Sequence, residues 1–175
     1  MKERGTSLGK TERLSWKERI LGKQLFVEGM HYEELKQNAT LVGTHLSFML
    51  HRRGQIVSIH FREGLEELEI YKDRPIKMVK EFLGNIRGDL GQLASMLDED
   101  PRLLNVKEIW GLCGLSTLWG ERHGFTTKIW SRNLEKIAKF EQSIMEKPNL
   151  DRMALNQPLS LFIHKRDSFR LEFLK

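Results

Sequence analysis

Residues 42–61 have the sequence VGTHLSFMLHRRGQIVSIHF, in which apolar and polar side chains alternate on both sides of Arg53-Gly54. Alternation with a period of two is typical of half-buried strands, so the stretch predicts a β-hairpin whose first strand runs unbroken from residue 42 to residue 50. A two-residue turn at Arg53-Gly54 places Leu50 opposite Val57, whereas a shift by one residue would set apolar against polar side chains. The same register pairs Phe48 with Ile59, Leu46 with Phe61, Ser47 with His60, and His45 with Arg62.

A long helix is predicted after the hairpin. Pro75 suits the first turn of a helix, where its missing N–H costs nothing. Apolar residues then recur every three or four positions over residues 76–97, the spacing of one helix face. Gly84, Gly88 and Gly91 lie inside this helix. They indicate either close packing against a neighbouring element or exposed positions that tolerate glycine.

Shorter elements follow in the second half of the chain. We predict strands at 106–112, 125–130 and 159–164, helices at 116–123 and 134–144, and a short charged C-terminal segment. The part from 106 to 130 is typical of a short βαβ unit. Together the patterns predict an α+β fold in which a small mixed sheet, containing the 42–61 hairpin, packs against the long helix and further helices. Residues 13–175 are expected to form a single domain and residues 1–12 a flexible tail.

A basic helix is predicted near the N-terminus. Ser15 followed by Glu18 forms a capping box, and the apolar residues after it have helical spacing. Residues 1–23 hold seven Lys and Arg against three Glu, which gives most of the net charge of +5. The candidate binding residues for an acidic protein or an anionic membrane surface are Lys10, Arg13, Lys17, Arg19 and Lys23. A solvated arm, or a helix face packed on the domain's own core, are the alternatives.

Composition limits the class of protein. Hydrophobic residues make up 39% and charged residues 30% of the 175 residues, which predicts a globular domain with one core. No stretch approaches the roughly 18 consecutive apolar residues that span a bilayer, and no signal peptide is recognised. The single cysteine, Cys113, favours a reducing compartment. We therefore expect a cytoplasmic protein, or one peripheral at the inner face of the membrane.

Polar residues that would carry chemistry are few. His45 and His60 are expected on one face of the hairpin, and with Glu63 they form a candidate polar or metal site. Histidines that are hydrogen-bonded or solvent-facing are the alternative, because the chain has no H-x-x-x-H spacing. Cys113 with His123 as base is a candidate nucleophile, against simple packing. No cofactor and no resident metal are expected.

Three tryptophans, Trp110, Trp119 and Trp130, flank the βαβ-like segment. Packing in the core is the default for such side chains. If exposed, they would instead suit a carbohydrate or lipid surface. The glycine-containing loop 111–117 is typical of a tight turn from strand to helix, although its position also suits an anion.

Four segments resemble the YkoP-like domain of Bacillus-type bacteria, over roughly residues 56–170. They are Ile56–His60, the helix end Leu97–Arg102, Val106–Gly111 and Arg122–Phe125. The resemblance implies an association with polysaccharide deacetylases and glycosyltransferases of the cell envelope, and it carries over no catalytic residue. The first 55 residues and the spacing of Ser116–Gly120 differ from the family's pattern.

The leading functional hypothesis is a non-catalytic binding or regulatory domain whose basic N-terminal helix engages an acidic partner or a membrane surface. A small enzyme with a histidine-containing polar site is one alternative. A nucleic-acid-binding protein is the other, although no helix-turn-helix, RNP or zinc-finger spacing is present.

Overall fold

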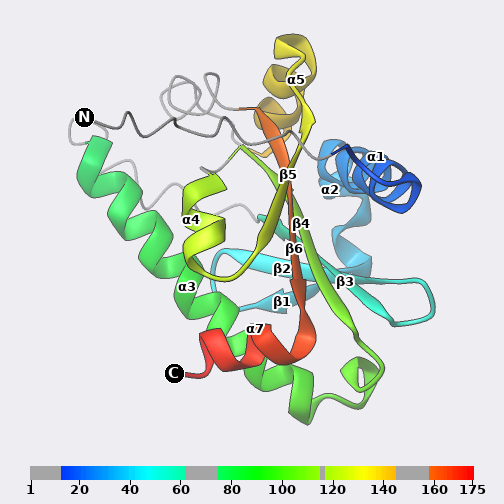
Figure 1. Ribbon diagram of the computed structural model, residues 1–175, viewed down its shortest axis with the longest axis vertical. Coiled ribbons are helices and arrows are strands. Elements are labelled where there is room, and N and C mark those ends of the chain that lie inside the picture. Colours follow the sequence, from blue (N-terminus) through cyan, green and yellow to red (C-terminus); the bar gives the residue numbers. More distant parts are fainter. Residues whose placement is uncertain (1–12, 62–74, 115–116, 145–157) are drawn as a thin grey trace, which may run out of the picture.

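The computed structural model describes residues 13–61, 75–114, 117–144 and 158–175. Within these residues six strands form one mixed sheet in the order β1-β2-β3-β4-β6-β5, with helices on both faces (Figure 1). The strands are β1 (Thr40–Val42), β2 (Leu46–His51), β3 (Ile56–Phe61), β4 (Glu108–Cys113), β5 (Thr126–Ser131) and β6 (Leu159–Lys165). The helices are α1 (Trp16–Met30), α2 (Tyr32–Leu35), α3 (Pro75–Glu99), α4 (Thr117–Arg122), α5 (Leu134–Ile144) and α7 (Arg166–Phe173), with 3-10 turns η1 (Lys36–Asn38) and η3 (Pro101–Leu103). The expected α+β fold with a mixed sheet and a long helix is confirmed.

The β2–β3 hairpin has the register that the alternation predicts. Leu50 pairs with Val57, and the pairs formed by residues 48 with 59, 46 with 61, and 47 with 60 are also present. At the tip, the N–H of Gln55 donates to the carbonyl of Arg52 over 3.3 Å and closes the turn. The predicted partner of His45, at position 62, lies outside the described residues.

The predicted first strand is wrong at its N-terminal end, because the chain reverses at Gly43. This glycine has a φ of 57°, in the left-handed region, and β1 returns along β2 with Val42 opposite Leu46. Asp89 of α3 holds the reversal. Its carboxylate accepts hydrogen bonds from the N–H groups of the next three residues over 3.3, 2.7 and 3.1 Å. A side chain from a distant helix thus divides what the local pattern predicts as one strand.

The sheet is built around a parallel pair. β3 and β4 run parallel, with Val57 opposite Ile109, and α3 lies in the connection between them. β6 lies between β4 and β5 and is antiparallel to both. The predicted βαβ-like segment 106–130 therefore supplies two strands that are not neighbours. The C-terminal residues, predicted only as a charged segment, form helix α7.

Each face of the sheet carries its own apolar cluster. On one face, α3 and α7 contribute Leu90, Leu93, Leu97, Phe169 and Phe173. On the other, α1 and α5 contribute Leu21, Leu25, Ile137 and Phe140, which pack with Trp110 of β4. Helix α1 is therefore an integral layer of the domain, and the alternative of a solvated arm is wrong for it.

Both explanations offered for the glycines of α3 apply. Gly84 and Gly88 have open space where a side chain would project, whereas a Cβ at Gly91 would lie 3.2 Å from the carbonyl oxygen of Phe173 in α7. We expect Gly84→Ala and Gly88→Ala each to stabilise the protein by about 0.5–1 kcal/mol, because alanine has the higher helix propensity. Thermal melting followed by circular dichroism should show rises of about 2 °C. Gly91→Ala is the control in the same helix, and an equal gain there would contradict its close contact with α7.

Candidate functional site

Helix α1 is anchored at its first turn and just beyond its last. The predicted capping box is present: Ser15 Oγ accepts from the N–H of Glu18 over 3.2 Å, and the Glu18 carboxylate accepts from the N–H of Ser15 over 2.6 Å. Glu18 also forms an ion pair of 2.9 Å with Lys128 on β5. Beyond the end of α1, the hydroxyl of Tyr32 lies 2.9 Å from Ser47 Oγ on β2. These contacts fix how the helix lies on the sheet.

Apolar side chains occur on both faces of α1. Leu21 and Leu25 on the inner face are buried. Trp16 is 73% exposed, Ile20 40% and Val27 46%. At 3.6 residues per turn these three positions lie within about 40° of one another around the helix. They therefore form a single apolar stripe turned away from the core.

Basic side chains share this stripe. Arg19 and Lys23 are exposed, and within the described residues neither side chain has a hydrogen-bond or ion-pair partner. We call Trp16, Arg19, Ile20, Lys23 and Val27 the α1 outer face.

The remaining predicted basic residues have different surroundings. Lys10 lies outside the described residues, and Arg13 is exposed just before the helix. Lys17 is turned toward the sheet, where its Nζ lies 2.7 Å from the carboxylate of Glu108 and 5.6 Å from the ring centroid of Trp110. Lys17 therefore contributes to the attachment of α1, whereas Arg19 and Lys23 remain available to a partner.

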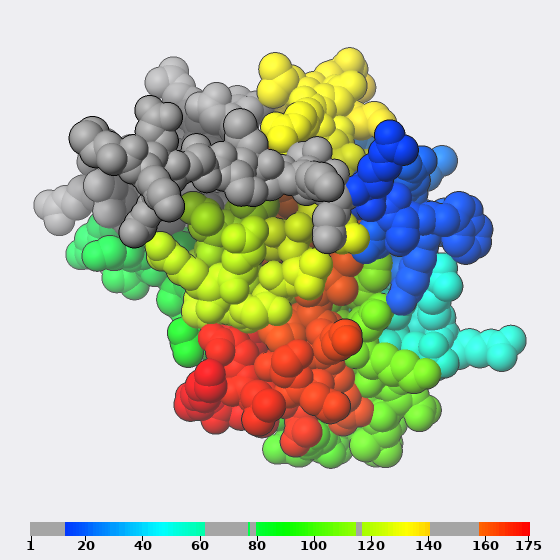
Figure 2. Space-filling model, in the orientation of Figure 1, coloured from blue at the N-terminus to red at the C-terminus, as the bar shows by residue number. Residues whose placement is uncertain are grey.

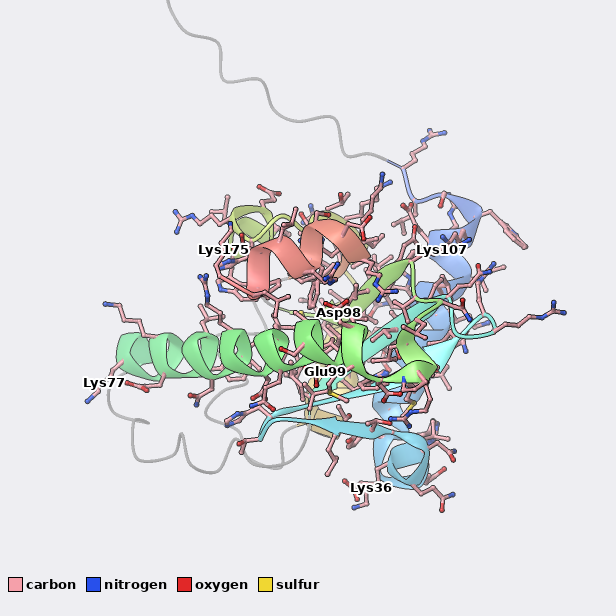
Figure 3. The ribbon with its side chains drawn as sticks, turned by 90° about the horizontal axis from the view of Figure 1, so that it is seen from below. Lys36, Lys77, Asp98, Glu99, Lys107 and Lys175 are labelled. Atoms are coloured by element: carbon pink, nitrogen blue, oxygen red, sulfur yellow. The ribbon has the colours of Figure 1, made fainter. Side chains whose placement is uncertain are left out.

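The tip of the β2–β3 hairpin projects on the same side of the protein as α1 (Figures 1 and 2). Arg52 and Arg53 at this tip are exposed. Lys107, just before β4, adjoins the turn, because its N–H donates to the carbonyl of Gln55 over 2.8 Å. In Figure 3, Lys107 lies on the same side as α1 and the hairpin. Positive charge from three separate segments therefore gathers on this side.

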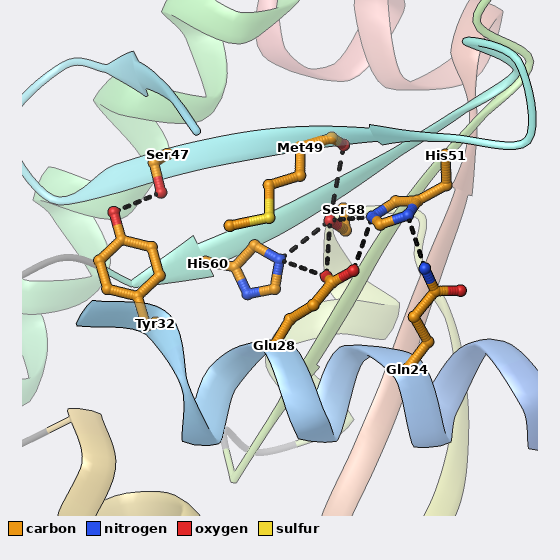
Figure 4. Close-up of polar contacts among 8 residues, drawn as sticks. All are labelled: Gln24, Glu28, Tyr32, Ser47, Met49, His51, Ser58 and His60. Carbon is orange, nitrogen blue, oxygen red and sulfur yellow. Dashed lines mark hydrogen bonds and ion pairs between the residues drawn. The ribbon is translucent and has the colours of Figure 1, made fainter. Parts of the chain in front are cut away.

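A buried polar network joins α1 to the hairpin (Figure 4). Glu28 points from α1 toward the sheet and is only 8% exposed. Its carboxylate lies 3.1 Å from Nε2 of His60 and 3.4 Å from Nε2 of His51. Ser58 Oγ lies between the imidazoles, 2.7 Å from His51 Nε2 and 2.9 Å from His60 Nε2. We call these four residues the Glu28 network.

One arrangement of protons satisfies these contacts. The amide group of Gln24 lies 3.1 Å from His51 Nδ1 and can donate to it, which leaves the proton of that ring on Nε2, facing Glu28. His60 presents its Nε2 proton to the same carboxylate. Burial by itself raises the pKa of the Glu28 carboxyl, but hydrogen bonds from His51 and His60, together with electrostatic attraction to these two rings, outweigh it and lower this pKa to about 2. Glu28 is therefore a carboxylate at neutral pH.

Two glycines bring α1 very close to its neighbours. A Cβ at Gly22 would lie 2.4 Å from the ring of Trp130, and one at Gly29 would lie 2.3 Å from the ring of Phe140. Because no side chain fits at either position, the helix packs directly against these two rings.

The Glu28 network does not have the geometry of a nucleophilic site. Ser58 is 0% exposed, so a substrate has no access to it. His60 contacts Ser58 and Glu28 through the same nitrogen, whereas a Ser-His-carboxylate triad uses the two ring nitrogens separately. A hollow of about 350 Å³ adjoins the network, and Arg102 is the arginine that lines it. The guanidinium of Arg102 already pairs with the carboxylate of Asp100 at 2.6 Å. The geometry favours a clamp between helix and sheet.

Of the candidate polar or metal site of His45, His60 and Glu63, the structure describes the two histidines. Glu63 lies outside the described residues. His45 is buried with its Nδ1 3.7 Å from the Asp89 carboxylate, and neither of its ring nitrogens has a hydrogen-bond partner. His60 instead contacts Glu28, on a helix of the opposite face. Among the described residues, no group of three or more His, Cys, Asp or Glu side chains could hold a metal ion.

The candidate nucleophile and its base also have separate surroundings. Cys113 is buried in the apolar cluster beneath α3. His123 packs against Trp119, and its Nδ1 lies 2.8 Å from the carboxylate of Glu172. The structure therefore favours packing as the role of Cys113.

Sequence reasoning missed two residues of the site. Glu28 follows Leu21 by seven positions and Leu25 by three, so it lies on the inner face of α1. A carboxylate at such a core-facing position is a signal of a buried polar network. The other is Trp16, the exposed tryptophan of α1. The other three tryptophans, Trp110, Trp119 and Trp130, pack against the two clusters.

No family model matches this chain. No curated protein and no solved structure matches it either. The resemblance to the YkoP-like domain accordingly stays a prediction. In the described part of the chain, none of the helices combines the length and apolar character needed to cross a bilayer.

Proposed function

We propose that this protein is a binding domain that docks on an anionic phospholipid surface through the α1 outer face. The observation that carries the proposal is Trp16, 73% exposed on the same helix face as the unpartnered cations Arg19 and Lys23. Tryptophan favours the interface between water and lipid, and basic side chains are attracted to anionic headgroups. A helix that presents both together is typical of proteins that lie on a membrane surface.

A bilayer accounts for more of this face than the other partners do. An acidic protein or a nucleic acid would meet the charges of Arg19 and Lys23, but charge attraction alone does not explain why Ile20 and Val27 extend the apolar stripe beside them. A bilayer receives the apolar side chains at the headgroup boundary while its phosphates meet the cations. The inner leaflet, where anionic lipids are abundant, is the surface that we propose. A link to envelope glycan metabolism, which the YkoP-like resemblance implies, would be compatible with that location.

Charge reversal on the α1 outer face tests the proposal. We expect the protein to co-sediment with vesicles containing phosphatidylglycerol and to bind much less to vesicles of phosphatidylcholine alone. Arg19→Glu/Lys23→Glu should lower the affinity for the anionic vesicles by roughly 30-fold or more, since each basic side chain near such a surface contributes about 1 kcal/mol. Thermal melting of the variant checks that it is folded.

A matched variant controls for net charge. Lys80→Glu/Arg87→Glu reverses two exposed charges on α3, which covers the opposite face of the sheet. It should keep most of the affinity, and an equal loss in both variants would mean that overall charge, not the α1 outer face, drives binding. Binding to poly-L-glutamate or duplex DNA in place of vesicles would overturn the proposal in favour of an acidic protein or a nucleic acid.

A further inference from the structure

The tip of the β2–β3 hairpin has a strained backbone. Arg52 has a φ of 49° and Arg53 a φ of 58°, and they are the non-glycine residues with positive φ in the described part of the chain. Tight turns with this backbone favour Asn and Gly, which adopt the left-handed conformation at low cost. Gly54, with a φ of 79°, fits this rule. The two arginines fit it poorly.

The side chains of Arg52 and Arg53 make no contact that would stabilise the described part of the fold. Both arginines are exposed, and within the described residues neither guanidinium has a hydrogen-bond or ion-pair partner. Strained residues that make no internal contact are found where a function outside the fold requires them. The tip is therefore a candidate site for binding a partner.

The tip also has a fixed position relative to the α1 outer face. His51, which directly precedes Arg52, lies 3.1 Å from Gln24 and 3.4 Å from Glu28, both on α1. Figure 2 shows the tip projecting from the surface next to this helix. The helix and the tip can therefore meet one flat surface at two separate points.

We infer that Arg52 and Arg53 bind the phosphate groups of the anionic bilayer on which α1 docks; this inference rests on the proposed function. A guanidinium presents a planar fork of N–H donors that matches two oxygens of one phosphate. The α1 outer face supplies apolar and cationic contact, and the tip supplies phosphate contact. Two contacts on one rigid body raise the affinity and set the orientation of the domain on the membrane.

Replacement of both arginines by asparagine separates fold from function. Asparagine tolerates the left-handed backbone, so Arg52→Asn/Arg53→Asn should raise the thermal midpoint by about 2 °C. The same variant should bind phosphatidylglycerol vesicles about 10- to 30-fold more weakly, because two cations near the surface are lost. A purely structural tip would give the rise in midpoint with unchanged affinity, and that result would overturn the inference.

Lysine variants test the role of the guanidinium. Arg52→Lys/Arg53→Lys keeps both charges and the strained turn but loses the fork of donors, so we expect an intermediate loss of affinity. Full affinity in this variant would overturn the phosphate contact. If Arg19→Glu/Lys23→Glu loses binding while the asparagine variant keeps it, the proposed function stands and the role of the tip is wrong. If the unaltered protein ignores anionic vesicles, the proposed function itself fails.

Discussion

Glu28→Gln is expected to destabilise the protein by about 3 kcal/mol at neutral pH. The substitution keeps the size of the side chain but removes the charge that His51 and His60 face in the buried Glu28 network. It also turns an amide N–H₂ toward imidazole N–H groups, so that donor faces donor. Urea denaturation followed by circular dichroism measures the loss. Glu135→Gln, which removes an exposed carboxylate paired with Lys139, is the control and should leave stability nearly unchanged.

The same residue sets a pH dependence. The pKa of Glu28 is lowered from 4.5 to about 2 in the folded protein, so the folded state favours the carboxylate form. This stabilisation is complete above about pH 4.5 and is lost as the pH falls toward 2. We therefore expect the difference in unfolding free energy between the unaltered protein and Glu28→Gln to shrink across this window. A difference that stays constant from pH 6 to pH 3 would contradict the ionised network.

Asp89→Ala should have an effect of similar size at the other end of the hairpin. The substitution leaves three N–H groups of the β1–β2 reversal without their acceptor, and the N–H groups of His45 and Leu46 are bonded to Asp89 in a buried environment. Buried donors without partners cost about 1–3 kcal/mol each, so a total of about 3 kcal/mol or more is expected. Equilibrium urea unfolding gives the value directly.

Asparagine at the same position is the matched comparison. Asp89→Asn keeps one side-chain oxygen, which can still accept from part of the reversal, so it should lose clearly less stability than Asp89→Ala. Equal losses in the two variants would show that charge rather than hydrogen bonding matters there. An unchanged unfolding midpoint for Asp89→Ala would mean that the reversal is held by other contacts.

Local patterns predicted the parts of the fold that depend on neighbouring residues. The hairpin register follows from alternation together with the turn at Arg53-Gly54, because a shift by one residue would place Leu50 and Val57 on opposite faces. The start of α1 follows from Ser15 and Glu18, which satisfy each other's backbone N–H groups. In both places the interacting groups are close in sequence, so the spacing of the residues is enough to predict how they pair.

The rest depends on contacts between distant residues. The strand expected from Val42 is broken because Asp89, more than forty positions away, binds the turn. His45 and His60 were expected to share a site, but they face carboxylates from helices on opposite sheet faces. The insertion of β6 between β4 and β5 likewise leaves no mark in the local pattern. These features depend on how the helices pack on the two faces of the sheet. A short stretch of sequence does not determine that packing.

The glycines at positions 22 and 29 have a kinetic consequence. Since α1 packs closely against two aromatic rings, we expect its outward stripe to be in place before any encounter. Association should then need no rearrangement, and its rate should follow long-range attraction. If the protein docks on a bilayer as proposed, added salt should slow its association with the bilayer much more than it speeds its dissociation.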